Sequence, residues 1–203
     1  IQYNYMDEEN QAGTRGLQYA AGKGLAVVVM EPIRGGMLAN PPAEVAALWE
    51  TAAHRRAPAE WALQWVWNHP EVSLALSGMS TMEQVEQNLQ SAGRSGPGTL
   101  SEEELALVAR VRDRYRELCP IPCTHCDYCQ PCPSGVCISR IFEVYNESVM
   151  YAAPQSLPRS YEWIKPEQRA DQCNECGQCE EQCPQDIAII EWLKKVRQEA
   201  EKG

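Results

Sequence analysis

The chain has 203 residues and a formal net charge of −10 at pH 7, and 44% of its residues are hydrophobic. This length suits one large domain or two small ones, and the confinement of the cysteines to the second half favours two. The negative charge disfavours nucleic acids and anionic membrane surfaces as partners. The longest apolar run, at residues 25–30, is far too short to span a membrane.

Elements of two kinds alternate in the first half of the chain. Three short aliphatic or β-branched segments predict strands, at residues 1–6, 25–30 and 72–77. Three helical patterns lie among them, at residues 14–21, 43–53 and 58–67. A fourth follows Thr81, whose spacing to Gln84 is typical of a capping box. This alternation predicts an α/β fold with parallel strands joined by crossovers, although three strands with open edges make an incomplete sheet.

The second half is expected to be helical. Residues 91–98 have the composition of a linker, and Ser101 and Glu104 form a second capping-box pattern at the start of a helix that leads to the first cysteines. Further helical patterns follow, at residues 139–151, 158–170 and 187–202. The predicted domains are therefore residues 1–98 and 99–203.

Eight of the ten cysteines form two dense runs. The first run contains Cys123, Cys126, Cys129 and Cys132, and the second contains Cys173, Cys176, Cys179 and Cys183. The second run has the x2, x2, x3 spacing and the following proline of bacterial ferredoxins, and the first run departs from it by one residue in its last gap. Because the last cysteine of such a run commonly ligates the other cluster, we expect two crossed 4Fe–4S sites. Cys183 then completes the first site and Cys132 the second.

Other interpretations of the cysteines stay open at this point. Structural zinc also uses CxxC pairs, but it normally takes two pairs separated by a loop. Disulfides suit a small secreted domain with cysteines throughout. One cluster beside a vestigial site is a further alternative. Cys119 and Cys137 are expected to be buried, unreactive thiols and His125 a surface residue, and ligand thiolates that must stay reduced point to the cytoplasm.

Four separated motifs resemble a known family. Residues 2–4 read Gln-Tyr-Asn, residues 30–36 read Met-Glu-Pro-Ile-Arg-Gly-Gly, and residues 77–88 run from Ser-Gly-Met-Ser to Glu-Gln-Asn. They resemble the segments after the last three strands of the (β/α)8 barrel of aldo-keto reductases. Residues 123–133 resemble an iron–sulfur domain appended to such a barrel, as do two pairs downstream, Ile141-Phe142 and Tyr145-Asn146.

The resemblance implies that the chain is the C-terminal portion of a longer protein, in line with its start at Ile1 without an initiator methionine. Residues 1–98 then hold the last three βα units of a (β/α)8 TIM barrel. Residues 99–203 form an all-α, ferredoxin-like domain. The family's catalytic Tyr, Lys, Asp and His come from the first half of the barrel, so no catalytic residue is assigned here, and this chain alone is not expected to reduce a carbonyl.

The resemblance also implies a nicotinamide nucleotide site at the C-terminal ends of the strands, where such barrels bind ligands. Its expected residues are Gln2, Pro32, Ile33, Arg34, Gly35, Gly36, Gly78, Met79, Ser80, Gln84 and Asn88. Gln2 matches the residue that binds the nicotinamide carboxamide, residues 32–36 match the loop over the pyrophosphate, and residues 78–88 match the adenosine end. Met79 and Gln84 stand where the family usually has an arginine for the 2′-phosphate of NADP, so NAD and NADP both stay open.

The expected function combines two kinds of chemistry. The resemblance implies hydride transfer between a nicotinamide and a small carbonyl or alcohol, whereas a 4Fe–4S cluster passes single electrons. One hypothesis is an enzyme whose clusters relay electrons to a redox partner protein such as a ferredoxin or flavoprotein. The alternatives are clusters with a purely structural role and a non-catalytic electron-transfer module. Acidic residues near the second run suit either a basic partner or plain solvation: Asp171, Glu175, Glu180 and Glu181.

Overall fold

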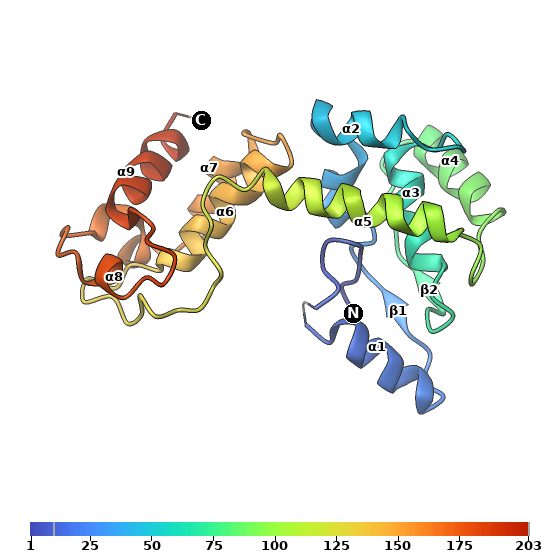
Figure 1. Cartoon of the computed structure of the whole chain (residues 1–203), viewed down its shortest axis with the longest axis horizontal. Helices are drawn as coiled ribbons and strands as arrows, with labels where there is room; N and C mark the ends of the chain where they lie inside the picture. Colours follow the sequence, from blue (N-terminus) through green and yellow to red (C-terminus); the bar gives the residue numbers. More distant parts are fainter. Residues whose placement is uncertain (10, 203) are drawn as a thin grey trace. The chain divides into compact units, whose positions relative to one another are not determined.

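The computed structural model describes residues 1–9 and 11–202, and the chain divides into two compact units, Ile1–Tyr115 and Arg116–Gly203 (Figure 1). Most of the described secondary structure is helical. Among these residues no helix combines the length and the apolar character that a membrane crossing requires. Each unit has its own core and is described by itself.

The strands of the first unit are parallel, as expected, but short. Strand β1 (Val28–Val29) pairs with β2 (Leu74–Ala75), and an isolated parallel bridge joins Gln2 to Met30. Successive strand residues point to opposite faces, and Val29 is fully buried whereas Val28 is 42% exposed. Val29 therefore points to the packed face of the sheet and Val28 to the exposed face, and the ladder is shorter than the predicted strands.

The described part of the first unit also contains helices. They are α1 (Gly13–Gly22), the 3-10 helix η1 (Arg34–Ala39), α2 (Ala43–Trp49), α3 (Pro58–Trp67), α4 (Met82–Ala92) and α5 (Glu102–Glu117). Helix α3 contacts η1, β2 and α4, and six of its ten residues, 61–66, are buried. Trp61 on α3 stacks on Trp49 with the rings 5.1 Å apart and 10° from parallel, and Arg56 covers Trp61 at 4.4 Å. Aromatic packing thus fixes α2 against α3.

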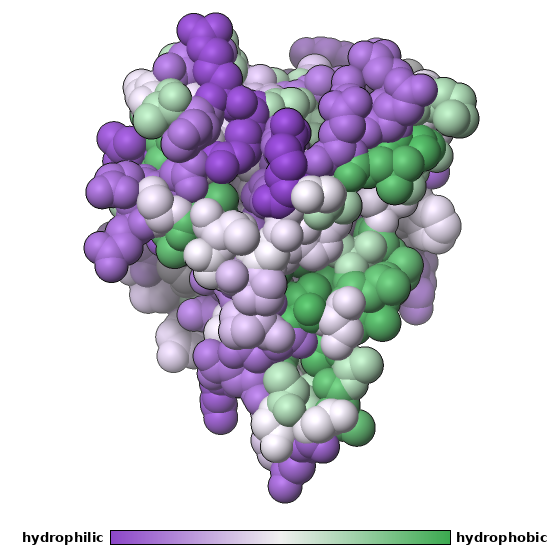
Figure 2. Space-filling model, turned by 90° about the vertical axis from the view of Figure 1, so that its right-hand side faces the viewer, coloured by the Kyte–Doolittle hydropathy of each residue, from purple (hydrophilic) through white to green (hydrophobic). Residues whose placement is uncertain are grey.

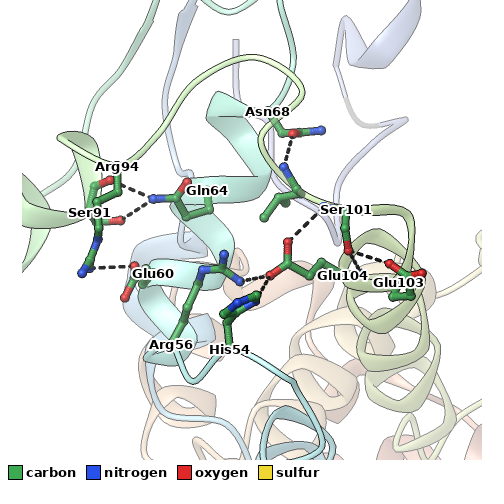
Figure 3. A network of polar contacts seen from close by, with 11 residues as sticks. His54, Arg56, Glu60, Gln64, Asn68, Ser91, Arg94, Ser101, Glu103 and Glu104 are labelled. Atoms are coloured by element: carbon green, nitrogen blue, oxygen red, sulfur yellow. Dashed lines mark hydrogen bonds and ion pairs between the residues drawn. The ribbon is translucent and has the colours of Figure 1, made fainter.

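The start of α5 is tied to the first unit (Figure 3). Both halves of the Ser101–Glu104 capping box form: the Ser101 N–H donates to Glu104 at 3.0 Å, and the Glu104 N–H donates to the Ser101 hydroxyl at 3.2 Å. Glu104 also pairs with Arg56, and the Leu100 N–H donates to the Asn68 side chain at 2.9 Å. These contacts explain why the units divide after Tyr115 and not in the linker at residues 91–98.

The described elements of the second unit are helical. They are α6 (Ile138–Met150), α7 (Ser156–Glu162), the 3-10 helices η2 (Pro166–Gln168) and η3 (Ala170–Gln172), α8 (Gln178–Glu181) and α9 (Ile189–Ala200). The single helix predicted at residues 158–170 is wrong. Pro166 lacks an N–H and disfavours a helical residue before it, so Lys165 is extended at φ −57° and ψ 139° and the helix stops at Glu162.

The core of the second unit lies directly beside the cysteine runs. Helix α6 packs against α7 and α9, and α9 also contacts η3 and α8. The buried positions of α9 follow one stripe of the helix, at Ile189, Leu193, Val196 and Ala200. Seven partly buried cysteines pack against this core: Cys123, Cys129, Cys132, Cys137, Cys173, Cys179 and Cys183.

Apolar side chains are also exposed on the first unit. Figure 2 shows apolar areas between polar ones on the face that it displays. The exposed large apolar residues of the unit are Tyr19, Leu25, Val28, Met30, Leu74, Leu76, Met79, Met82 and Leu89. Several belong to β1 and β2 or directly follow them, on the sheet face opposite the buried Val29.

Candidate iron–sulfur and nucleotide sites

The two cysteine runs follow the same backbone path. In each run the second and fourth residues after the first cysteine have positive φ, at His125 (55°) and Asp127 (58°) in one and at Glu175 (58°) and Gly177 (78°) in the other. The third residue after the last cysteine does so too, at Gly135 (77°) and Asp186 (50°). A long helix follows each run, α6 or α9. The two runs differ by one residue in the last gap, but their backbones are equivalent before and after that gap.

Two pockets bring the cysteines together in crossed sets. Pocket A is lined by Cys123, Cys126, Cys129 and Cys183. Pocket B, about 220 Å³, is lined by Cys132, Cys173, Cys176 and Cys179 and also by Cys129. Each pocket thus joins three cysteines of one run with the last cysteine of the other. This is the grouping that the sequence leads us to expect, and ligation itself stays a prediction.

The chemistry of both pockets fits a 4Fe–4S cluster. Such a cluster takes one thiolate per iron, so four cysteines must surround a core. The walls are partly apolar: Ile138, Phe142 and Ile189 line pocket A, and Val136, Ile190 and Leu193 line pocket B. In the described part of the chain, no three His, Cys, Asp or Glu side chains are close enough to share a single metal ion.

Burial keeps several of these thiols protonated when no metal is bound. It raises the pKa of Cys123 and Cys129, and it raises the pKa of Cys179 to about 11. A backbone donor acts in the opposite direction at Cys123, where the His125 N–H lowers the pKa of the thiol. In the second run the Glu175 N–H donates to the Cys173 sulfur at 3.4 Å. Metal loading therefore releases protons from these sites.

The remaining cysteines lie apart from both pockets. Cys119 is 3.4 Å from the Met150 sulfur, and Cys137 is the residue before α6. Burial raises the pKa of both thiols, which suits the expected unreactive role. His125 lies in the first run but, among the described residues, lines neither pocket.

Asn146 was not predicted as a site residue, although it supports one. Its side chain, on α6, accepts a hydrogen bond from the Ile121 N–H at 3.0 Å and donates one to the Ile121 carbonyl at 2.8 Å. Asn146 is 8% exposed. This buried clamp fixes the backbone two residues before Cys123. Its signal in the sequence was a polar residue on the apolar face of an amphipathic helix.

A cleft of about 810 Å³ lies in the first unit, between the loop after β1 and the start of α4. Eight of the eleven predicted nucleotide residues line it: Pro32, Ile33, Gly35, Gly36, Gly78, Ser80, Gln84 and Asn88. The other three predicted residues, Gln2, Arg34 and Met79, do not line this cleft. Gln2 bonds the Gln11 side chain at 2.9 Å, Arg34 pairs with Asp7, and Met79 is 43% exposed.

The loop after β1 depends on left-handed backbone. Gly35 and Gly36 have φ of 60° and 91°, and Arg34 before them has φ of 49°. Asn4, fully buried, donates to the Glu31 carbonyl at 3.0 Å and holds the start of the loop. Glycines in this conformation let the backbone approach a bound group closely.

Comparisons with known proteins identify both regions of the chain. Residues 1–112 match the Aldo/keto reductase family. The chain belongs to this family. Residues 122–188 match a 4Fe–4S dicluster domain, and all eight cysteines of the two runs lie within them. The second unit of this aldo/keto reductase therefore carries a dicluster domain.

Among solved structures, the aldo/keto reductase region is similar to the aldo-keto reductase AKR11C1 from Bacillus halodurans in its holo form. The match has 24% sequence identity and a TM-score of 0.43, and it covers 54% of this chain and 40% of that one. The chain thus spans less than half the length of this relative. No curated protein matches at a significant level.

Proposed function

We propose that this chain carries two 4Fe–4S clusters that relay single electrons within a nicotinamide-dependent oxidoreductase of the aldo/keto reductase type. The observation that carries the proposal is that pockets A and B are each lined by three cysteines of one run and the last cysteine of the other. The first unit of the same chain contains a cleft with a glycine-rich loop. The substrate class is a small carbonyl or alcohol. A ferredoxin or flavoprotein in a reducing compartment is the proposed electron partner.

In the dicluster domain the chain's own residues hold and insulate the clusters. Cys123, Cys126, Cys129 and Cys183 ligate one, and the cysteines of pocket B ligate the other. Bound clusters accept or donate one electron at a time. The backbone N–H of Glu175, already directed at the Cys173 sulfur, stabilises negative charge there, and the apolar walls limit water access.

In the aldo/keto reductase region the cleft residues position a nicotinamide nucleotide. Gly35 and Gly36 bring backbone close to the pyrophosphate, and the N-terminus of α4, capped by Thr81, faces the adenosine end. Asn88, which lines the cleft and donates to the Ser77 hydroxyl at 3.1 Å, would bond the adenine. The parallel strands are proposed to be the last of a (β/α)8 barrel, whose other strands cover the exposed sheet face and supply the catalytic residues.

The test is iron, sulfide and zinc analysis of the chain purified without oxygen, with EPR after dithionite reduction. About eight irons and eight sulfides with interacting cluster signals support the proposal. About four irons restrict it to a single cluster, and zinc without sulfide overturns it. Clusters that are neither reduced nor oxidised across physiological potentials would have a structural role. NADH binding, followed by fluorescence, tests the cleft separately.

A further inference from the structure

Pockets A and B share part of their walls. Tyr128, Cys129 and Ile138 line both of them. Ile138 is 1% exposed and Cys129 is partly buried, whereas Tyr128 is 66% exposed. Of the three shared residues, Tyr128 is therefore the one that is mostly exposed to solvent.

Tyr128 breaks the equivalence of the two runs. It lies between Cys126 and Cys129, and the matching position in the second run, between Cys176 and Cys179, is Gln178. Gln178 lines pocket B alone. Of these two equivalent positions, the one that lines both pockets is therefore the one with an aromatic residue.

The loop that carries Tyr128 is fixed to α6. Asp127, the residue before it, accepts a hydrogen bond from the Ser139 hydroxyl in the first turn of α6 at 2.7 Å. The Asp127 carbonyl accepts from the Gln130 N–H at 2.9 Å, which closes a turn around Tyr128. These two hydrogen bonds fix the backbone on both sides of Tyr128. The exposed tyrosine therefore belongs to an ordered turn that lines both pockets together with Ile138.

We propose that Tyr128 is a common shield of both cluster sites, one side chain that sets the access of water and oxidants to each. The inference rests on the proposed pair of 4Fe–4S clusters. Reduction adds negative charge to a cluster, and water stabilises that charge, so a ring that excludes water lowers the reduction potential. One residue then shifts the reduction potentials of both clusters in the same direction.

The experiment measures both midpoint potentials by EPR-monitored titration of the reconstituted chain, and the loss of cluster absorbance in air. Tyr128→Ala is expected to raise both potentials and to accelerate the loss of both clusters. Tyr128→Phe keeps the ring and is expected to behave as the original chain. Gln178→Ala is the matched control, because it removes a side chain at the equivalent position that lines pocket B alone, and it is expected to affect a single cluster.

A shift of one cluster only in Tyr128→Ala, or of neither, overturns the shield. If Tyr128→Ala loads fewer irons than the original chain, Tyr128→Gln replaces it, since this variant carries the residue that the second run uses at the same position. An original chain that binds no iron and sulfide overturns the proposed function instead, so that the two failures are distinguishable.

Discussion

The crossed arrangement of the cysteines makes a quantitative prediction for pairs of substitutions. Cys123→Ala and Cys183→Ala both act on pocket A, so combining them removes two ligands from one cluster and leaves the other intact. Cys173→Ala and Cys183→Ala act on pockets B and A, so combining them damages both clusters. Each 4Fe–4S cluster holds four irons, so the first pair should retain about four of eight irons and the second pair close to none.

The assay is iron and sulfide content after anaerobic reconstitution, with circular dichroism to verify the helix content of each variant. Cys119→Ala is the control, because Cys119 lines neither pocket, and it should retain about eight irons. If each run ligated its own cluster, the two pairs would exchange their results. That reversed pattern would falsify the crossed assignment.

Three further predictions concern the supports of the sites. Asn146→Leu should cost the dicluster domain about 2 kcal/mol, because it leaves the buried N–H of Ile121 unpaired, whereas the Ile121 carbonyl still accepts from the Cys123 N–H at 2.8 Å; denaturant unfolding measures the loss, and an unchanged midpoint would contradict the clamp. Glu104→Gln tests a pH dependence. Burial opposes the charge of Glu104, but Arg56 and the Ser101 N–H outweigh it and lower its pKa, so the carboxylate stabilises the fold above its unfolded pKa and this stability is lost as the pH falls through the folded one. Thermal melts from pH 7 to pH 3 should therefore show a weaker acid decline in the variant, and an equally steep decline would refute the effect. Gly36→Val places a β-branched residue at φ 91°, which should cost about 1–3 kcal/mol and weaken NADH binding in a fluorescence titration; unchanged binding would separate this loop from the nucleotide.

Local chemistry in the sequence predicted many elements correctly. The Thr81–Gln84 and Ser101–Glu104 spacings marked the starts of α4 and α5, and in both cases the hydroxyl accepts the N–H three residues on. Two of the three predicted strands form, shorter than expected and parallel, whereas residues 1–6 contribute only a single bridge at Gln2. The break at Pro166 was readable from the sequence as well, since a proline beyond the first turn of a helix removes a backbone donor and disfavours a helical residue before it.

Contacts between distant residues account for the features that the sequence did not predict. Helix α5 belongs to the first unit because Arg112 pairs with Glu8, 104 positions away, and Arg56 pairs with Glu104. The Asn146 clamp on Ile121 is of the same kind. Gln2 pairs with Gln11 and Arg34 pairs with Asp7, and no sequence motif predicted either pairing. Periodicity and spacing carry no information on such pairings.

The crossed lining of the pockets also has a consequence for biosynthesis. A nascent chain presents Cys123, Cys126 and Cys129 early, yet pocket A is complete only after residues 130–182 have been made and Cys183 has followed. Pocket B already contains Cys132, and it waits for the second run as well. Neither site can therefore be finished before the second run is made, and a chain terminated before Cys173 offers iron neither crossed set of ligands.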